Sequence, residues 1–541
     1  MGWNSRRYAR ALGAGVGLAL LAAACGDDDG EGGASGETSE APVPTETSSP
    51  DEPEFDPDGE LVVMLDKQPV TLDPAKTINN QSWPYIFEIY DRLIGRDADN
   101  GLVPMLATDW SFSDDGLTFD MELRDDVRFN DGTPLTSADV KASLDRAKTV
   151  AGTAWGTILA PVVAVETPGT HEVRIVLDRP LGSLPAVLTS PAGAVINAKV
   201  IAEGRDLGID PGRAAGSGPR VVTDLVVNSR ADFERADDDY WDPEANRLAK
   251  VTILFAADAE ARLNAFRSGQ ADVIKVNFGI AEQAKALADS DDSALYKEKE
   301  GAGQFVVYFN SKKPGLAEVA VRRALNLAID REAIESFFDG DCTATTQLYG
   351  EGQPGYDPDL DDQFEYDPEE AKRLLGSTGV GNLTLDLVFP AVSPYDVVAT
   401  LVQEQLKAVG VEVSVAGIDG ASSTTQFIGG QGDMLVGNMV AQIDPSQIVN
   451  NHFLGVQKLS VDVAPEVEAL QAEGLTRRGT SSDWEEKYQE IAAVAGEKAL
   501  YIPICNIKAQ YLVNLRVGGF EEIAGQKDSA GLEARDLWVL P

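Results

Sequence analysis

Residues 104–140 read PMLATDWSFSDDGLTFDMELRDDVRFNDGTPLTSADV, and they carry the clearest structural signals in the chain. Apolar and polar side chains alternate over 117–123, directly after an Asp-Gly dipeptide, which is the pattern of a hairpin strand with one buried face. The Asn-Asp-Gly-Thr-Pro sequence at 130–134 is rich in turn residues. Thr-Ser-Ala-Asp at 136–139 is a capping box ahead of apolar residues at helical spacing. This stretch predicts a hairpin followed by a turn and a helix.

Outward from this stretch, helical and strand patterns alternate along the chain. A short apolar strand precedes it, and two strand and helix units follow it. The second unit opens with Asp-Pro-Glu-Glu at 367–370, which suits a helix N-terminus. The expected strands are 61–65, 251–255, 271–276, 383–389 and 411–415, and the expected helices are 258–268, 367–376 and 394–409. Such alternation predicts mixed α/β lobes.

The 104–140 stretch closely resembles the family 5 extracellular solute-binding proteins, which include oligopeptide-, dipeptide- and nickel-binding components of ABC importers. The likeness spans residues 58 to 541 and continues at Gly216-Ser217-Gly218-Pro219, Tyr240-Trp241, 265–272, Phe309-Asn310 and 321–331. Most of these motifs are glycines, turn dipeptides and caps, which fix a backbone and do not bind a ligand. They therefore identify the scaffold and leave the binding site open.

The resemblance implies an α/β, two-lobed fold of the periplasmic-binding-protein class, with an extra subdomain in lobe I and mixed sheets joined by a hinge. Lobe I is expected at 59–300 with a return segment at 500–541, and lobe II at 301–499. By the same resemblance, the protein captures a peptide or peptide-like solute between the lobes and delivers it to an ABC permease and ATPase complex. We expect a monomer that is not an enzyme and needs no cofactor.

Peptide-binding relatives commonly carry a Trp-x-x-Asp loop in lobe II, whose Asp anchors the α-ammonium of the ligand. The matching loop here has Asn438 at the Trp position and Ala441 at the Asp position, so the acidic anchor is absent. We still expect this loop to line the cleft, although it could serve only as a connection. The candidate ligand contacts are Asn438, Met439, Val440, Ala441, Gln442, Asn79, Asn80, Trp155 and Gln353, of which the last four have packing or turn roles as their alternative.

The N-terminus carries an export signal. Arg6, Arg7 and Arg10 precede an uncharged apolar run at 11–24, which is too short to span a membrane comfortably. The sequence around Cys25 resembles a bacterial lipobox, which implies a signal peptide at 1–24 and a lipid on Cys25. An ordinary secretory signal with an incidental cysteine is the alternative. The localisation expected is the outer face of the cytoplasmic membrane, or the periplasmic side of the envelope.

Residues 25–58 predict a flexible acidic linker, because Gly, Ser, Thr, Pro and acidic residues cannot build a core. The whole chain is also acidic, with a formal net charge of −43. Such a charge repels phosphate backbones and anionic lipid headgroups, so it argues against nucleic-acid binding and against membrane contact other than through the lipid. The two remaining cysteines, Cys342 and Cys505, could form one bridge, but we expect both to be free and buried.

Two other classes of protein compete with this interpretation. An anchored hydrolase is disfavoured, because the chain has only His171 and His452, no Gly-x-Ser-x-Gly motif and no closely spaced His or Cys ligand set for a metal. We expect surface or structural roles for both histidines. A sensor lipoprotein of the same fold, which imports nothing, stays open. The identity of the ligand also stays open, because this fold accommodates peptides, sugars, chelated nickel and other solutes.

Overall fold

The computed structural model describes residues 55–77, 80–98, 101–151, 155–236, 239–291, 293–339, 341–380, 382–420, 422–440, 442, 444–454, 465–476, 482–520 and 532–541. All of them belong to one compact unit, Pro53–Pro541. The predicted signal peptide, Cys25 and most of the acidic linker lie outside these residues. In the part described, no helix is long and apolar enough to cross a membrane.

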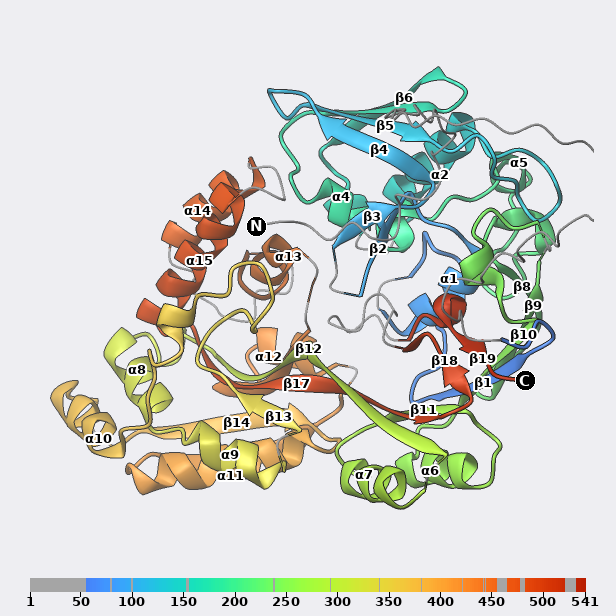
Figure 1. The fold of residues 1–541 in the computed structure, drawn as a ribbon. Coiled ribbons are helices and arrows are strands. Elements are labelled where there is room, and N and C mark those ends of the chain that lie inside the picture. The colour runs from blue at the N-terminus through green and yellow to red at the C-terminus, as the bar shows by residue number, and fades with distance from the viewer. Residues whose placement is uncertain are drawn as a thin grey trace, which may run out of the picture. The chain divides into compact units, whose positions relative to one another are not determined.

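One large mixed sheet organises this unit, with strand order β15-β14-β16-β12-β17-β11-β1-β10-β9-β8 (Figure 1). The short strand β13 pairs with β17 beside this path. The strands are β1 Glu60–Leu65, β8 Arg220–Val226, β9 Arg230–Arg235, β10 Lys250–Phe255, β11 Val273–Val276, β12 Ala294–Phe309, β13 Cys342–Ala344, β14 Thr384–Pro390, β15 Glu412–Ile418, β16 Met434–Val440 and β17 Tyr501–Asn514. The strands of the predicted alternating α/β units therefore belong to one continuous sheet.

Two long antiparallel strands, β12 and β17, run through the middle of this sheet, and we call them the crossing strands. Their first pairing segment joins Ala294–Lys299 to Ala509–Asn514, beside β11. Their second joins Gly303–Tyr308 to Tyr501–Ile507, beside β16. The register shifts between Lys299 and Gly303, and Gly303 has φ of 156°, a conformation that glycine adopts most readily. The irregularity therefore separates the two halves of the sheet.

The two faces of the crossing strands carry different cores. Beside β11, Tyr511 and Val513 belong to the core around β1, whereas Leu512 belongs to a core with the helices α6 Ala259–Arg267 and α7 Ala281–Ser290. Beside β16, Val306 and Tyr308 on the front face belong to one core, whereas Phe305 on the back face meets the helices α9 Arg331–Phe337 and α11 Tyr395–Ala408 (Figure 1). The cores draw their residues from 61–294 with 509–539, and from 305–505.

The helices begin where the sequence predicts them. Asp258 caps α6 by accepting a hydrogen bond from the Ala261 amide at 2.7 Å. Asp367 caps α10, Pro368–Ser377, in the same way. In the predicted capping box, the carboxylate of Asp139 accepts a bond from the Thr136 amide at 2.9 Å, at the start of α2, Ser137–Thr149. These side chains satisfy amides that a helix leaves unpaired at its N-terminus.

The predicted hairpin is also confirmed, and it belongs to a separate antiparallel sheet of order β4-β5-β7-β6. These strands are β4 Ala107–Phe112, β5 Thr118–Leu123, β6 Val162–Gly169 and β7 Glu172–Leu177. Phe119 and Met121 point to one side, where they pack with α2. The residues that alternate with them along the strand face the opposite side, because successive side chains of a strand point to opposite faces.

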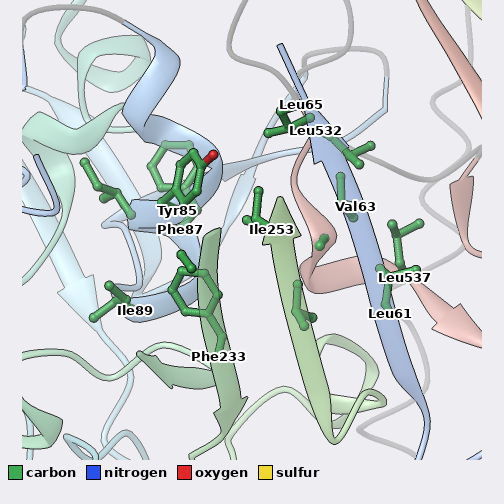
Figure 2. Packing of buried hydrophobic residues seen from close by; sticks show 14 of the residues in the cluster. Leu61, Val63, Leu65, Tyr85, Phe87, Ile89, Phe233, Ile253, Leu532 and Leu537 are labelled. Carbon is green, nitrogen blue, oxygen red and sulfur yellow. The ribbon is translucent and has the colours of Figure 1, made fainter. Parts of the chain in front are cut away.

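The C-terminal segment packs on the first strand of the sheet. Leu532 and Leu537 lie beside Leu61 and Val63 of β1 in one hydrophobic core (Figure 2). Other side chains of this core come from β9, β10 and α1, Trp83–Ile89. Residues from opposite ends of the folded chain thus share one core.

Most buried cationic side chains are paired. Arg92 and Glu533 form a bidentate ion pair, with N–O distances of 2.9 and 2.7 Å. Arg220 pairs with Glu88, and Arg535 lies 3.3 Å from the carboxylate of Asp91. Other buried arginines donate to backbone carbonyls, as Arg331 does to Pro503 at 2.7 Å. These partners offset part of the cost of removing a charge from water.

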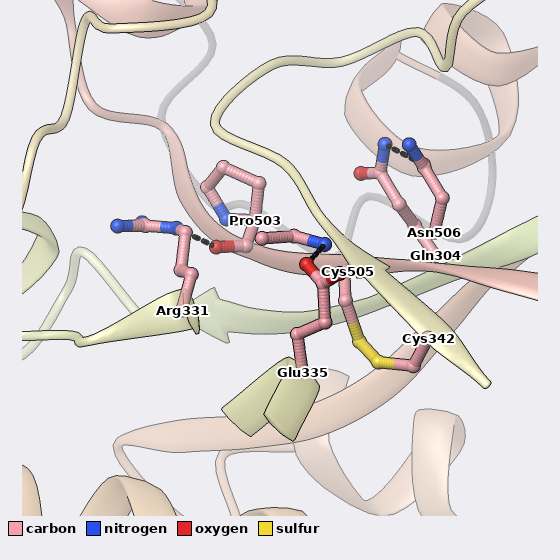
Figure 3. Close-up of a disulfide and its surroundings, with 8 residues drawn as sticks. Gln304, Arg331, Glu335, Cys342, Pro503, Cys505 and Asn506 are labelled. Atoms are coloured by element: carbon pink, nitrogen blue, oxygen red, sulfur yellow. Dashed lines mark hydrogen bonds between the residues drawn. A yellow bond between two sulfur atoms is a disulfide. The ribbon is translucent and has the colours of Figure 1, made fainter. Parts of the chain in front are cut away.

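The expectation of free cysteines was wrong, because Cys342 and Cys505 form a disulfide (Figure 3). Strand β13 pairs antiparallel with β17, so that Thr343 lies opposite Asn506. This register places the two cysteine Cα atoms 5.4 Å apart, within the range that a disulfide spans. Their separation of 163 residues in the sequence concealed this proximity.

Candidate functional site

A small hollow, with free space of about 10 Å³, opens on the front face beside the register shift of the crossing strands. It forms where the crossing strands, β16 and the loop after β13 meet. Its lining consists of Gly303, Gln304, Leu348, Gln353, Met439, Ile448 and Asn506. None of these side chains carries a charge, so the hollow offers amide groups and apolar surface to a ligand. Such a mixture is typical of sites that bind neutral parts of small molecules.

Gln304 is the most constrained polar group in this lining. Its amide nitrogen donates to the Gln347 carbonyl at 3.0 Å. The same nitrogen donates to the Asn506 side-chain oxygen, also at 3.0 Å (Figure 3). These two bonds use both amide hydrogens. Its own oxygen, Oε1, is buried and has no hydrogen-bond partner among the described residues. A buried acceptor without a donor is costly, so this oxygen is suited to accept a bond from a ligand or a water.

The loop after β13 is held in place by its own side chains. The Gln347 side chain donates to the Asp357 carbonyl at 3.0 Å, and Gln353 Oε1 accepts a bond from the Gly350 amide at 3.0 Å. The hydroxyl of Tyr349 donates to the Pro445 carbonyl at 3.3 Å, which ties this loop to the segment after β16. The wall of the hollow is thus organised before any ligand arrives.

The predicted 438–442 loop begins at this hollow. Met439 lies opposite Gln304 in the sheet and lines the hollow directly. Val440 lies opposite Gly303, and Asn438 lies opposite Phe305 with its side-chain oxygen buried and unpaired within the described part of the chain. Gln442 is half-buried, and its amide donates to the Val440 carbonyl at 3.4 Å. Ala441 lies outside the described residues.

Of the other predicted ligand contacts, some line the hollow and some do not. Gln353 lines the hollow. Trp155 does not, because it is buried in the core of the four-stranded sheet, where its indole nitrogen donates to the Pro74 carbonyl at 3.2 Å. Trp155 therefore has the packing role that the sequence analysis gave as the alternative to a ligand contact. Asn79 lies outside the described residues, and Asn80 begins a short 3-10 helix, Asn80–Ser82.

Asp444 follows the loop, but it is already engaged. Its carboxylate caps α13, Pro445–Val449, by accepting a bond from the Ser446 amide at 2.7 Å. The side chain is buried, and this burial raises its pKa to about 6. The cap and the burial both keep this carboxylate from replacing the acidic anchor that is missing at position 441.

The two histidines have structural surroundings. His452 is buried, and its Nδ1 shares a hydrogen bond of 2.9 Å with the hydroxyl of Tyr308. Burial lowers its pKa to about 4. His171 is half-buried just before β7. No group of three His, Cys, Asp or Glu side chains able to hold a metal ion occurs in the described segments.

Several residues of the hollow escaped sequence analysis. Gly303 could have been found, because a glycine inside a strand often marks a bulge or a close approach. Gln304 and Asn506 carry no such signal, since polar residues in two distant strands give no hint that they meet. Leu348 and Ile448 look like ordinary core residues.

Comparison with known proteins identifies the family. Residues 101–459 match the model of the bacterial extracellular solute-binding proteins, family 5. A glutathione-binding protein, GsiB of Escherichia coli O1:K1, is 28% identical over 380 residues, which cover 68% of this chain and 72% of that relative.

Solved structures give the fold. The ABC transporter substrate-binding protein CtaP of Listeria monocytogenes superposes with a TM-score of 0.78 at 20% identity, over 89% of this chain and 99% of that one. The periplasmic binding protein DppA of Helicobacter pylori, solved with the peptide STSA, gives 0.73 at 19% identity, over 89% and 98%. At these identities the likeness concerns the fold alone, and it confirms the predicted periplasmic-binding-protein class.

The burial of His452 predicts a pH-dependent loss of stability. Its pKa falls from 6.5 to about 4 on folding, so the stability it contributes is complete above pH 6.5 and is lost as the pH falls through about 4. We expect this loss to reach up to roughly 3 kcal/mol. His452→Gln removes the titration, so urea unfolding between about pH 7 and pH 4 should give a shallower decline for the variant. His171→Gln is the control, and equal declines for wild type and His452→Gln would contradict the assignment.

Proposed function

We propose that this chain, which belongs to the bacterial extracellular solute-binding proteins of family 5, captures a peptide or peptide-like solute at the front-face hollow. Proteins of this family are the substrate-binding components of ABC importers and act outside the cytoplasm. The observation that carries the proposal is the place of the hollow, at the register shift of the two strands that join the halves of the sheet.

We take lobe I as 59–300 with 500–541 and lobe II as 301–499. The boundaries near 300 and 500 then fall on the crossing strands, which serve as the hinge. A ligand held in the hollow would touch both lobes only when they close, so binding shifts the equilibrium between open and closed forms. The permease and ATPase of an importer would recognise the closed form of a monomer.

The ligand should not be a short peptide with a free α-ammonium. The lining of the hollow is uncharged, position 441 is alanine, and Asp444 is committed to its helix cap. An unpaired buried ammonium is costly, so zwitterionic di- and tripeptides are disfavoured. We therefore infer a longer or N-blocked peptide, or another amide-bearing solute.

A sensor lipoprotein would share this fold and this hollow. Reading frames for a permease and an ATPase beside this one favour import, and their absence favours sensing. Catalysis is not part of the proposal. Turnover of esters or peptides by the purified protein would favour a hydrolase instead.

Closure of the lobes is tested by small-angle X-ray scattering. Purified protein that has been stripped of bound solute is compared with protein saturated by the solute recovered from native preparations. We expect a smaller radius of gyration in the saturated sample, because the lobes close about the crossing strands. An unchanged radius at saturation would count against a hinge.

Restoring the acidic anchor should change selectivity. Ala441→Asp supplies a carboxylate for the α-ammonium, so we expect short free-amine peptides to bind more tightly by ~1–3 kcal/mol. Calorimetry with a short-peptide library measures this gain, and N-acetylated versions of the same peptides are the control. Micromolar binding of unblocked dipeptides to the unmutated protein, with blocked versions excluded, would refute the proposed selectivity.

Anchoring at Cys25 is tested by intact mass. The apolar run at 11–24 and the Ala-Ala-Ala-Cys sequence support a mature protein that begins at a lipid-modified Cys25. Stable anchoring takes more than one acyl chain, so the mass of detergent-extracted protein should exceed that of residues 25–541 by a diacylglyceryl group or more. A mature N-terminus elsewhere, or an unmodified cysteine, would show that the lipid is absent.

A further inference from the structure

The Cys342–Cys505 disulfide joins the two segments that hold the Gln304 side chain in the hollow (Figure 3). Gln304 donates to the carbonyl of Gln347, which follows β13, and to the side-chain oxygen of Asn506 on β17. Cys342 begins β13, and Cys505 directly precedes Asn506. The bond between the cysteines thus connects the strand that leads to one acceptor with the strand that carries the other.

The disulfide and the hollow lie on opposite faces of β17. Both cysteines are fully buried in the core of the back face, together with Phe305. Asn506 points to the other face, because successive side chains of a strand alternate, and it lines the hollow. A ligand in the hollow would not touch the disulfide. Any effect of this bond on binding must therefore act through the positions of β13 and β17.

Strand β13 is a short attachment to β17. It has only three residues, and beyond them the Thr345 amide donates to the Ile504 carbonyl at 3.2 Å. The side chains of the following loop bond to other segments, at the carbonyls of Asp357 and Pro445. Each hydrogen bond of this kind contributes little net stability. The covalent bond is therefore the strongest link between this loop and β17.

The loop after β13 packs closely on Asn506. A Cβ atom added to Gly350 would lie 3.3 Å from the nearest atoms of the Asn506 side chain. A shift of the loop away from β17 would loosen this packing, and it would lengthen the hydrogen bond from Gln304 to the Gln347 carbonyl. The open oxygen of Gln304 would then lose the fixed direction that the two hydrogen bonds give it.

The redox state of the two cysteines depends on the compartment. Disulfides form in oxidising compartments and are rare in the cytoplasm. Proteins of this family act outside the cytoplasm. A precursor inside the cell would therefore carry Cys342 and Cys505 as thiols. The 163 residues between them would then lack the cross-link that favours their contact in the folded chain.

We propose that formation of the Cys342–Cys505 disulfide completes the hollow, so that only the oxidised protein binds its ligand tightly. This inference rests on the proposed function. In the reaction the two thiols lose two protons and two electrons to a disulfide-bearing oxidant, whose own disulfide is reduced to a dithiol. Both cysteines are positioning residues, because they fix Gln304 through β13 and β17. A reduced precursor in the cytoplasm would bind its ligand weakly.

The test compares oxidised wild-type protein with the double variant Cys342→Ala, Cys505→Ala. The probe is the tightest binder that calorimetry finds in a library of N-acetylated tetrapeptide amides. We expect the double variant to bind it about tenfold more weakly, as the loss of one oriented hydrogen bond implies. Wild-type protein refolded with its cysteines reduced should bind as weakly, and oxidation should restore the affinity.

Leu144→Ala is the control for stability, because Leu144 is buried in a different core, that of the four-stranded sheet. It should lower the melting temperature and leave the affinity unchanged. Gln304→Leu keeps the disulfide and should lose affinity as the double variant does. Removal of both cysteines from Gln304→Leu should then cost little more, because the group that the disulfide positions is already absent.

Equal affinity of oxidised wild type and the folded double variant overturns the inference and leaves the proposed function standing. An equal loss of affinity in Leu144→Ala also overturns it, because stability and not position would then govern binding. Tight binding by Gln304→Leu overturns it whether or not the cysteine variants fold. If neither a peptide of the library nor a solute released from native preparations binds, the proposed function is overturned with the inference.

Discussion

The pairing of β12 with β17 is the interaction on which the rest of this structure depends. In the order of the large sheet, β16 and β14 lie on one side of this pair, and β11, β1 and β10 lie on the other. Each half of the sheet then supports its own hydrophobic cores. The register shift at Gly303 interrupts the pairing of these two strands between the halves of the sheet. The candidate site lies beside that irregularity.

The hollow on the front face is an uncharged recognition surface in an acidic chain. The hollow presents amide and apolar groups whose hydrogen bonds are largely committed to one another, and it leaves the acceptor of Gln304 open. The net charge of −43 repels anions at long range, so recognition at the hollow would depend on short-range contacts and not on electrostatic steering of an anion.

The sequence predicted local structure well and long-range proximity poorly. The hairpin at 117–123, the helix start near Asp258, the cap at Asp367 and the alternating α/β order depend on neighbouring residues, and all of them are confirmed. The charged run around Lys297 hid the length of β12, because its alternation is weak. The disulfide and the contact between Gln304 and Asn506 depend on the register of distant strands, which no local pattern records. Met439 and Gln353 were found at the hollow, whereas Trp155 followed the commoner rule that a buried tryptophan packs.

The central place of β17 has a consequence for biosynthesis. This strand comes from residues 501–514, yet it is the hydrogen-bonded neighbour of both β11 and β12. A chain that crossed the membrane unfolded, N-terminus first, would therefore complete neither half of the sheet until nearly all of it had crossed. Until then, β11 and β12 present open edges that other chains could pair with. On such a route the last strand to cross would be one that both halves of the sheet need, and chaperones outside the cytoplasm would have a long time to act on the unfolded chain.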